Sequence, residues 1–172
     1  MVIAFDLSQR VACSIDRTFS FLSNLANMPR WNYFIQSVTQ VSQGTVGKGT
    51  VFKQKRPSDL FYVKIVEFNP PNKIMAQLQP PGPDLLYSFT LTSLEGQTEV
   101  LYSWRLNVEH YSILKYVPRG SFKNWIISII EKQILTKTKP AVAQNFYKLK
   151  TLLETGQVIL QDGRTMTLPD GL

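Results

Sequence analysis

The feature that most constrains this fold is a stretch of about 35 residues near the C-terminus, Ser121 to Thr155, with apolar residues at helical spacing. Val142, Phe146, Leu149 and Leu153 fall at i, i+4, i+7 and i+11, which places them on one face of an α-helix. Such a helix extends roughly 50 Å and cannot bury that face by itself. The upstream half has a wider apolar face, made by Phe122, Trp125, Ile126, Ile129, Ile130 and Ile134. The rest of the chain must therefore supply a surface that covers this helix.

The ends of this helix also have sequence signals. Ser121 is a good residue to cap the start, and Gly156 is typical of the position just past a helix end. Pro140 lacks a backbone donor and disfavours helical geometry at Lys139, so we expect a kink or break there.

The chain before the helix is predicted to form strands. Val2 to Cys13 alternates apolar with polar residues, as a half-buried strand does. Six further strands are predicted at short intervals, over residues 35–41, 50–55, 61–68, 73–79, 85–93 and 98–109. Since no helix separates these six, they favour an antiparallel meander.

The remaining segments are short. Two helical pieces are expected between the first two strands, one capped by Asp16 and one opened by Pro29 and running through Phe34. The glycines at 44–49 indicate a hairpin turn rather than a phosphate loop, because a strand and no Lys-Ser/Thr pair follows. After Gly156, the Asp162-Gly163 pair predicts either a small hairpin or a loose tail. We therefore expect an α+β ligand-binding domain over 1–156, with the tail or hairpin over 157–172.

Composition excludes several classes of function. Cys13 is the single cysteine and His110 the single histidine, which excludes an internal disulfide, a cysteine zinc cluster and a histidine-rich site. We predict no metal and no cofactor. The N-terminus lacks the basic start of a secretory signal, and no apolar run approaches the roughly 18 residues of a membrane span. These observations favour a reducing, cytoplasmic location.

The net charge of +7 is concentrated in one region. Between residues 111 and 150, Glu131 is the only acidic residue, against eight basic ones: Lys115, Arg119, Lys123, Lys132, Lys137, Lys139, Lys148 and Lys150. Three interpretations remain open. The plainest is a solvated helix face, the second is peripheral contact with an anionic membrane, and nucleic acid is the weakest because no binding motif accompanies the charge.

The order of elements and four short motifs resemble the Bet v 1-like superfamily, which includes START domains and polyketide cyclase/dehydrase-type (SRPBCC) proteins. The motifs are Ile15 to Leu22, the Asn-x-Pro-x-Trp segment Asn27 to Trp31, the glycine turn Val46 to Thr50, and the ending Leu149-Lys150-x-x-Leu153-Glu154. The resemblance implies a helix-grip fold, in which a curved antiparallel sheet of about seven strands wraps the long C-terminal helix. It also implies an apolar cavity of the kind that this superfamily uses for lipids, quinones, polyketides, plant hormones and steroids, and occasionally for catalysis.

Candidate ligand-binding residues are those whose side chains are expected between the sheet and the helix. Tyr87 and Tyr102 offer hydroxyls, and Gln9 and Gln54 offer amides that must find partners when buried. Plain core packing, with hydrogen bonds to backbone or water, is the alternative for each of them. The remaining candidates are Phe52, Val63, Phe89 and Trp104 on the strands, and Trp125, Ile129 and Phe146 on the helix.

The inventory for catalysis is small. His110 and Glu67 are the candidate general acids or bases, and both fall near strand ends where water is close. No set of nucleophile, base and orienting group can be assembled around one histidine. We therefore expect a carrier or chaperone that binds an apolar small molecule, such as a lipid, isoprenoid quinone or polyketide-like ring compound. The alternative is a polyketide cyclase/dehydratase-like enzyme that uses the same cavity.

Overall fold

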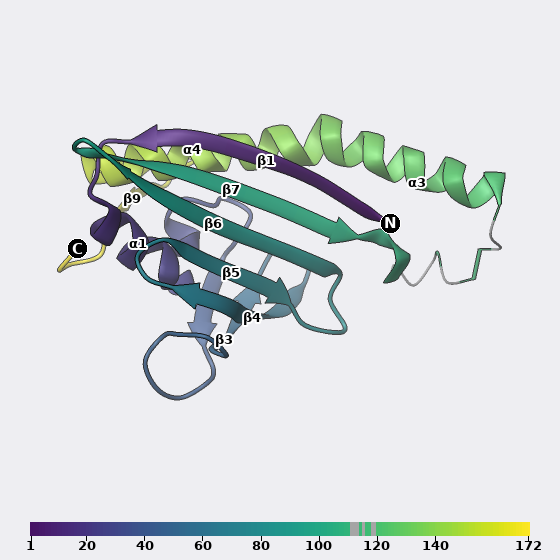
Figure 1. Ribbon diagram of the computed structural model, residues 1–172, viewed down its shortest axis with the longest axis horizontal. Coiled ribbons are helices and arrows are strands. Elements are labelled where there is room, and N and C mark those ends of the chain that lie inside the picture. The colour runs from purple at the N-terminus through teal and green to yellow at the C-terminus, as the bar shows by residue number, and fades with distance from the viewer. Residues whose placement is uncertain (111–113, 115, 118–119) are drawn as a thin grey trace.

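The computed structural model describes residues 1–110, 114, 116–117 and 120–172. A curved seven-stranded antiparallel sheet wraps a long C-terminal helix, with two short helices at one end (Figure 1). The strands are β1 (Val2–Val11), β2 (Ser37–Gln40), β3 (Val51–Lys55), β4 (Leu60–Asn69), β5 (Lys73–Leu78), β6 (Asp84–Leu94) and β7 (Gln97–Asn107). Their order in the sheet is β1-β7-β6-β5-β4-β3-β2, so β2 to β7 form a meander and β1 closes beside β7. The predicted α+β helix-grip fold is confirmed.

Alternation on β7 shows how the sheet obtains its two faces. Val100, Tyr102, Trp104 and Leu106 are buried, whereas Arg105 on the other face is exposed. In the register of the sheet, Trp104 lies between Phe5 of β1 and Tyr87 of β6, and Tyr102 lies between Leu7 and Phe89. A continuous aromatic surface therefore faces the helix.

The short helices differ from the prediction in their boundaries. Helix α1 (Ile15–Ser23) is capped by Ser14, whose hydroxyl accepts from the Arg17 N–H, and Asp16 lies in the first turn instead. A carboxylate there still favours the helix, because it faces the positive end of the helix dipole. The second piece is a 3-10 helix, η1 (Leu25–Arg30), which contains Pro29 rather than starting at it and ends before Phe34.

The long helix continues through Pro140 instead of breaking there. It consists of α3 (Ser121–Gln133), a π-helical turn η3 (Ile134–Thr138) and α4 (Lys139–Thr155). Within the π-helical turn, the Lys139 N–H bonds to the Ile134 carbonyl, five residues back. This longer bond precedes the proline that cannot donate, and Lys139 keeps helical dihedrals.

The two predicted ends of the long helix have different outcomes. Ser121 does not cap its start, because Gly120 occupies the cap position without a side-chain hydrogen bond. Gly156 ends the helix as predicted, at φ +81°, with its N–H bonded to the Leu152 carbonyl.

The C-terminal segment forms the hairpin alternative, with β8 (Gln157–Ile159) and β9 (Thr165–Thr167). Val158 and Leu160 are buried in the common hydrophobic core. The hairpin is also tied down by polar contacts, because Lys148 donates to the Ile159 carbonyl and Arg30 donates to the Thr167 carbonyl. The division of the chain at 156 stays a prediction.

Candidate ligand-binding cavity

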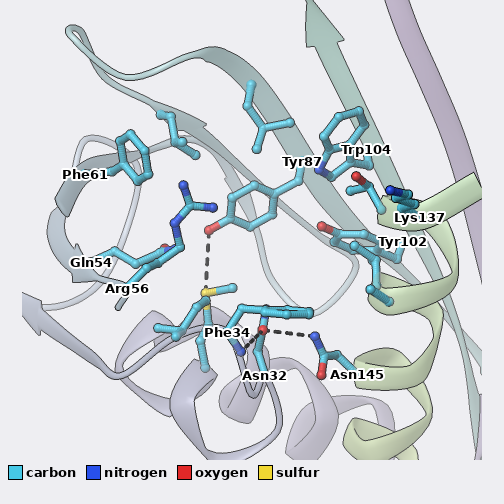
Figure 2. A pocket seen from close by; sticks show the side chains of 17 residues that line it. Asn32, Phe34, Gln54, Arg56, Phe61, Tyr87, Tyr102, Trp104, Lys137 and Asn145 are labelled. Carbon is cyan, nitrogen blue, oxygen red and sulfur yellow. Dashed lines mark hydrogen bonds between the residues drawn. The ribbon is translucent and has the colours of Figure 1, made fainter. Parts of the chain in front are cut away.

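A cavity of about 410 Å³ lies between the sheet, the chain that follows η1, and the junction of η3 with α4 (Figure 2). Its size falls within the range of small-molecule sites. The sheet and its loops supply Gln54, Arg56, Phe61, Leu78, Leu85, Tyr87, Tyr102 and Trp104; the other walls are Met28, Asn32, Phe34, Ile35, Lys137, Thr138, Ala141, Val142 and Asn145.

The wall on the sheet side is aromatic. The Tyr102 ring packs against Phe89 with ring centroids 4.9 Å apart, against Phe146 at 5.9 Å and against Tyr87 at 6.3 Å. Trp104 stacks on Phe5 at 5.0 Å. These contacts hold the rings in place from behind, so the cavity side of the wall is rigid and largely apolar.

Several polar groups on this apolar wall lack good partners. The Tyr87 hydroxyl reaches only the Met28 sulfur, a weak acceptor, at 3.7 Å. Within the described parts of the chain, the Tyr102 hydroxyl, the Trp104 indole N–H and the Gln54 amide have no hydrogen-bond partner, although these side chains are buried. Figure 2 shows both tyrosine hydroxyls directed into the cavity. Among the described residues, the Thr18 hydroxyl is the only unpaired side-chain polar atom that is fully buried, so the polar atoms of Tyr102, Trp104 and Gln54 are accessible from the cavity, where water or a polar ligand atom could satisfy them.

Both phenols are neutral at physiological pH. Burial raises the pKa of Tyr87 far above its usual value of 10.0. Burial raises the pKa of Tyr102 in the same way, and its proximity to Tyr87 adds to the effect. Each hydroxyl therefore keeps its proton and can donate it in a hydrogen bond to an acceptor oxygen.

Asn145 joins three segments at the helix side of the cavity. Its Oδ1 accepts from Gln161 Nε2 at 2.9 Å and from the Tyr33 N–H at 3.4 Å, and its Nδ2 donates to Asn32 Oδ1 at 3.1 Å. Both the oxygen and the nitrogen of this amide are bonded within the protein, in contrast to the amide of Gln54. The hydrogen bonds of Asn145 therefore stabilise the cavity wall by linking three segments of the chain.

Two basic side chains lie on the wall of the cavity. Arg56 is bound in a bidentate pair by Asp59, at 2.6 and 2.7 Å, and its guanidinium lies 4.5 Å from the Phe61 ring centroid. The hydrogen bond from Arg56 holds the pKa of Asp59 below its usual value of 3.8. Lys137, on the π-helical turn, is exposed.

Comparison with known proteins identifies the family. A family model described as polyketide cyclase / dehydrase and lipid transport matches residues 2–154. The chain belongs to this family. No protein with a curated description matches the sequence.

Solved structures share the fold of this family member at low sequence identity. A START superfamily protein from Mycobacterium smegmatis has 15% identity and a TM-score of 0.63, over 87% of this chain and 98% of that one. A protein from Nitrosospira multiformis has 12% identity and a TM-score of 0.59, over 88% and 97%. The di-domain ARO/CYC StfQ from the steffimycin biosynthetic pathway has 13% identity and a TM-score of 0.64, over 88% of this chain and 50% of that one.

Four of the predicted ligand-binding residues line the cavity: Gln54, Tyr87, Tyr102 and Trp104. The aromatic and aliphatic candidates Phe52, Val63, Phe89 and Phe146 are buried core behind the wall. Gln9 donates to the Phe146 carbonyl at 2.7 Å, so its amide has a backbone partner. That these residues bind a ligand stays a prediction.

The expectation that Trp125 and Ile129 face the sheet is wrong. Both are exposed, whereas Ile127 is buried on that helix. The sequence offers two apolar faces on α3, and the face that includes Ile127 turns inward. The sequence contains a signal for this orientation, because Ile127 and Ile134 lie seven residues apart and therefore on one helix face. Both side chains are buried in the structure.

The predicted catalytic candidates do not meet in the cavity. The register of β4 shifts between Ile65 and Glu67, which takes Glu67 out of the inward alternation of Val63 and Ile65. Glu67 pairs instead with Lys73 at 2.9 Å, with its side chain exposed to water. The His110 side chain lies outside the described residues. No group of three or more His, Cys, Asp or Glu residues that could hold a metal occurs in the described parts of the chain.

Sequence reasoning missed the walls opposite the sheet. Met28 and Asn32 fall in and just after the Asn-x-Pro-x-Trp segment, which signalled the family but not a cavity wall. Asn145 had a local signal, since it is a polar residue next to Phe146 in the apolar stripe. Lys137 and Thr138 had none that points to the cavity.

Proposed function

We propose that this protein binds an apolar small molecule that carries acceptor oxygens, such as an isoprenoid quinone or a polyketide-like ring compound, and acts as its carrier or chaperone. The observation behind this is the pairing of an apolar cavity with unpartnered groups, the Tyr102 hydroxyl and the Gln54 amide above all. A carbonyl oxygen can accept from Tyr102, whereas a plain alkyl chain would leave these groups unpaired. The family description, polyketide cyclase / dehydrase and lipid transport, supports a ligand of this class.

The first experiment is native mass spectrometry of the protein purified from its own host, followed by organic extraction. We expect a bound molecule with a ring or chain and at least one carbonyl oxygen. The complementary titration adds an isoprenoid naphthoquinone to the protein and follows quenching of tryptophan fluorescence. Trp104 lies on the cavity wall, so the variant Trp104→Phe should lose most of the signal.

The role of the hydroxyl is tested with Tyr102→Phe. One hydrogen bond contributes about 1 kcal/mol, so affinity for the naphthoquinone should fall roughly fivefold. The matched control is the same ring and chain without the two carbonyl oxygens, for which wild type and Tyr102→Phe should bind equally. Equal affinity of the wild type for both compounds, or no binding across a lipid and quinone panel with no co-purified molecule, would refute the proposal.

A cyclase/dehydratase-like enzyme is the second candidate, favoured by two neutral phenols that could polarise a substrate carbonyl. Dehydration also needs a base, and no carboxylate or imidazole is among the described residues that line the cavity. The geometry therefore supports binding better than this reaction. Incubation with a polyketide-like ring compound distinguishes them, because an enzyme would release product lighter by one water.

A further inference from the structure

Helix α3 has an apolar surface that nothing in the described chain covers. Phe122, Trp125 and Ile129 lie at i, i+3 and i+7, on one face, and are 63%, 58% and 39% exposed. The Phe122 and Trp125 rings stack with centroids 5.8 Å apart. The opposite face carries Ile127, which is buried. This exposed set, Phe122, Trp125 and Ile129, is called the α3 stripe below.

The α3 stripe is well placed to meet a large partner. Figure 1 shows α3 extending past the end of β7, so this part of the helix projects from the sheet. Exposed patches of large apolar and aromatic side chains mark interaction sites in soluble proteins. A stacked Phe and Trp pair beside an aliphatic residue is the composition that peripheral helices use at a bilayer interface.

The charge around the α3 stripe selects the partner. Lys132 follows Ile129 by three residues, so it borders the stripe, whereas Lys123 precedes the buried Ile127 by four residues and lies on the other side of the helix. Neither forms an ion pair within the described residues. Residues 111–150 contain a single acidic residue, Glu131. A surface of this kind is complementary to an anionic one.

We infer that the α3 stripe, with Lys132 at its edge, docks on the surface of an anionic lipid bilayer. The aromatic rings enter the headgroup region and Lys132 faces lipid phosphates, with the helix parallel to the membrane. In the described chain, no helix has the length and apolarity needed to cross a bilayer. The π-helical turn that follows α3 carries Lys137 and Thr138 of the cavity wall, so docking brings the cavity close to the membrane.

The test is flotation of the full chain with phosphatidylcholine vesicles, with and without phosphatidylglycerol. We expect flotation only with phosphatidylglycerol, falling several-fold at high salt, because the screening length shrinks from about 10 Å at 0.1 M to about 3 Å at 1 M. Lys132→Gln should lower partitioning about fivefold. Lys53→Gln, at an exposed position on β3, is the matched control and should change it little.

The apolar part is tested with the double variant Phe122→Ser and Trp125→Ser. Both side chains are exposed, so the fold should persist, and vesicle binding should fall at least about tenfold. Tyr147→Ser, on α4 at 61% exposure, is the control and should bind as wild type. Brominated lipid should quench wild-type fluorescence but not that of Trp125→Phe, since Trp31 and Trp104 are buried.

Two results would overturn the inference. The first is flotation that does not depend on phosphatidylglycerol or on the α3 stripe. The second is a dimer of wild type in solution that the double variant converts to monomer, with no flotation, which would assign the stripe to a second copy of this chain. Neither outcome bears on the ligand titration, so docking and the proposed function can fail separately.

Discussion

Two buried threonines give opposite predictions for the same substitution. Thr18 on α1 and Thr98 on β7 are both inaccessible to solvent. The Thr98 hydroxyl donates to the Cys13 carbonyl at 2.8 Å. The Thr18 hydroxyl has no hydrogen-bond partner among the described residues. Replacing each by valine removes the hydroxyl, keeps the shape and adds a methyl group.

The magnitudes follow from this difference in pairing. A buried hydroxyl without a partner costs about 1–3 kcal/mol, so Thr18→Val should raise the free energy of unfolding by about 1–2 kcal/mol. Thr98→Val loses a bond and leaves the Cys13 carbonyl unpaired, so it should lower that free energy by about 1–2 kcal/mol. For a chain of this size, about 1 kcal/mol shifts the Tm by roughly 2–4 °C.

Urea unfolding followed by circular dichroism, with thermal scans in parallel, measures both changes. The slope against urea should stay constant, so that the midpoint reports stability alone. The two variants should differ by about 2–4 kcal/mol, with opposite signs relative to wild type. Shifts of the same sign and size would refute the assignment of Thr18 as unpaired and Thr98 as bonded.

Three further substitutions test a residue of the cavity wall, a glycine packed against the wall residue Phe61, and an ion pair at the end of α4. Asn145→Ala removes the amide that joins α4 to Asn32 and Gln161, so it should lower the free energy of unfolding in urea by about 2 kcal/mol. The control Asn124→Ala, at an exposed position, should leave that free energy unchanged or raise it slightly. Equal changes in the two variants would contradict the hydrogen-bond network of Asn145. Gly82→Ala would place a Cβ 2.8 Å from the Phe61 ring carbon Cδ1 and 3.0 Å from the Gln79 carbonyl oxygen, so it should destabilise by about 1–3 kcal/mol; Gly47→Ala, with nothing within 4 Å, should not. Burial raises the pKa of Glu154, but hydrogen bonds from Lys150 and the Ala12 N–H outweigh it and hold the pKa below 4.5. Since a lowered pKa contributes stability above the unfolded value, Glu154→Gln should be less stable than wild type at pH 7, and the gap should close as pH falls below 4.5; a constant gap would count against this ion pair.

Elements with a strong period could be predicted from the sequence alone. The alternation of Val100, Tyr102 and Trp104 lies within a single strand. The apolar stripe of Phe146, Leu149 and Leu153 lies within a single helix. Both patterns report burial on one face, which the structure confirms. The resemblance to a family added that the sheet wraps the long helix, which periodicity does not contain.

Boundaries and irregularities depend on contacts with distant parts of the chain. Ser14 and Asp16 are both good capping residues two positions apart, and only the direction of the chain leaving β1 decides between them. The register shift that turns Glu67 outward is a property of the β4 and β5 pair, not of β4 alone. The π-helical turn before Pro140 likewise has no signal in local propensity.

The cavity was the hardest feature to predict, because it depends on side-chain size across three segments. On α4, the inward positions Phe146, Leu149 and Leu152 carry large side chains that are buried in the hydrophobic core. One to two turns earlier the helix presents Thr138, Ala141 and Val142.

These shorter side chains cannot reach the sheet, and the space that they leave is the cavity. Opposite them stand Tyr87, Tyr102 and Trp104, whose polar atoms would need partners from the helix. Alanine and valine side chains cannot provide any, and the Thr138 hydroxyl forms no hydrogen bond with these side chains within the described residues, so the helix supplies no partner for them. The same shortage of side-chain volume thus produces both the space and the unpaired hydrogen-bond donors, and this combination is the reason for proposing a ligand with acceptor oxygens rather than a purely aliphatic one.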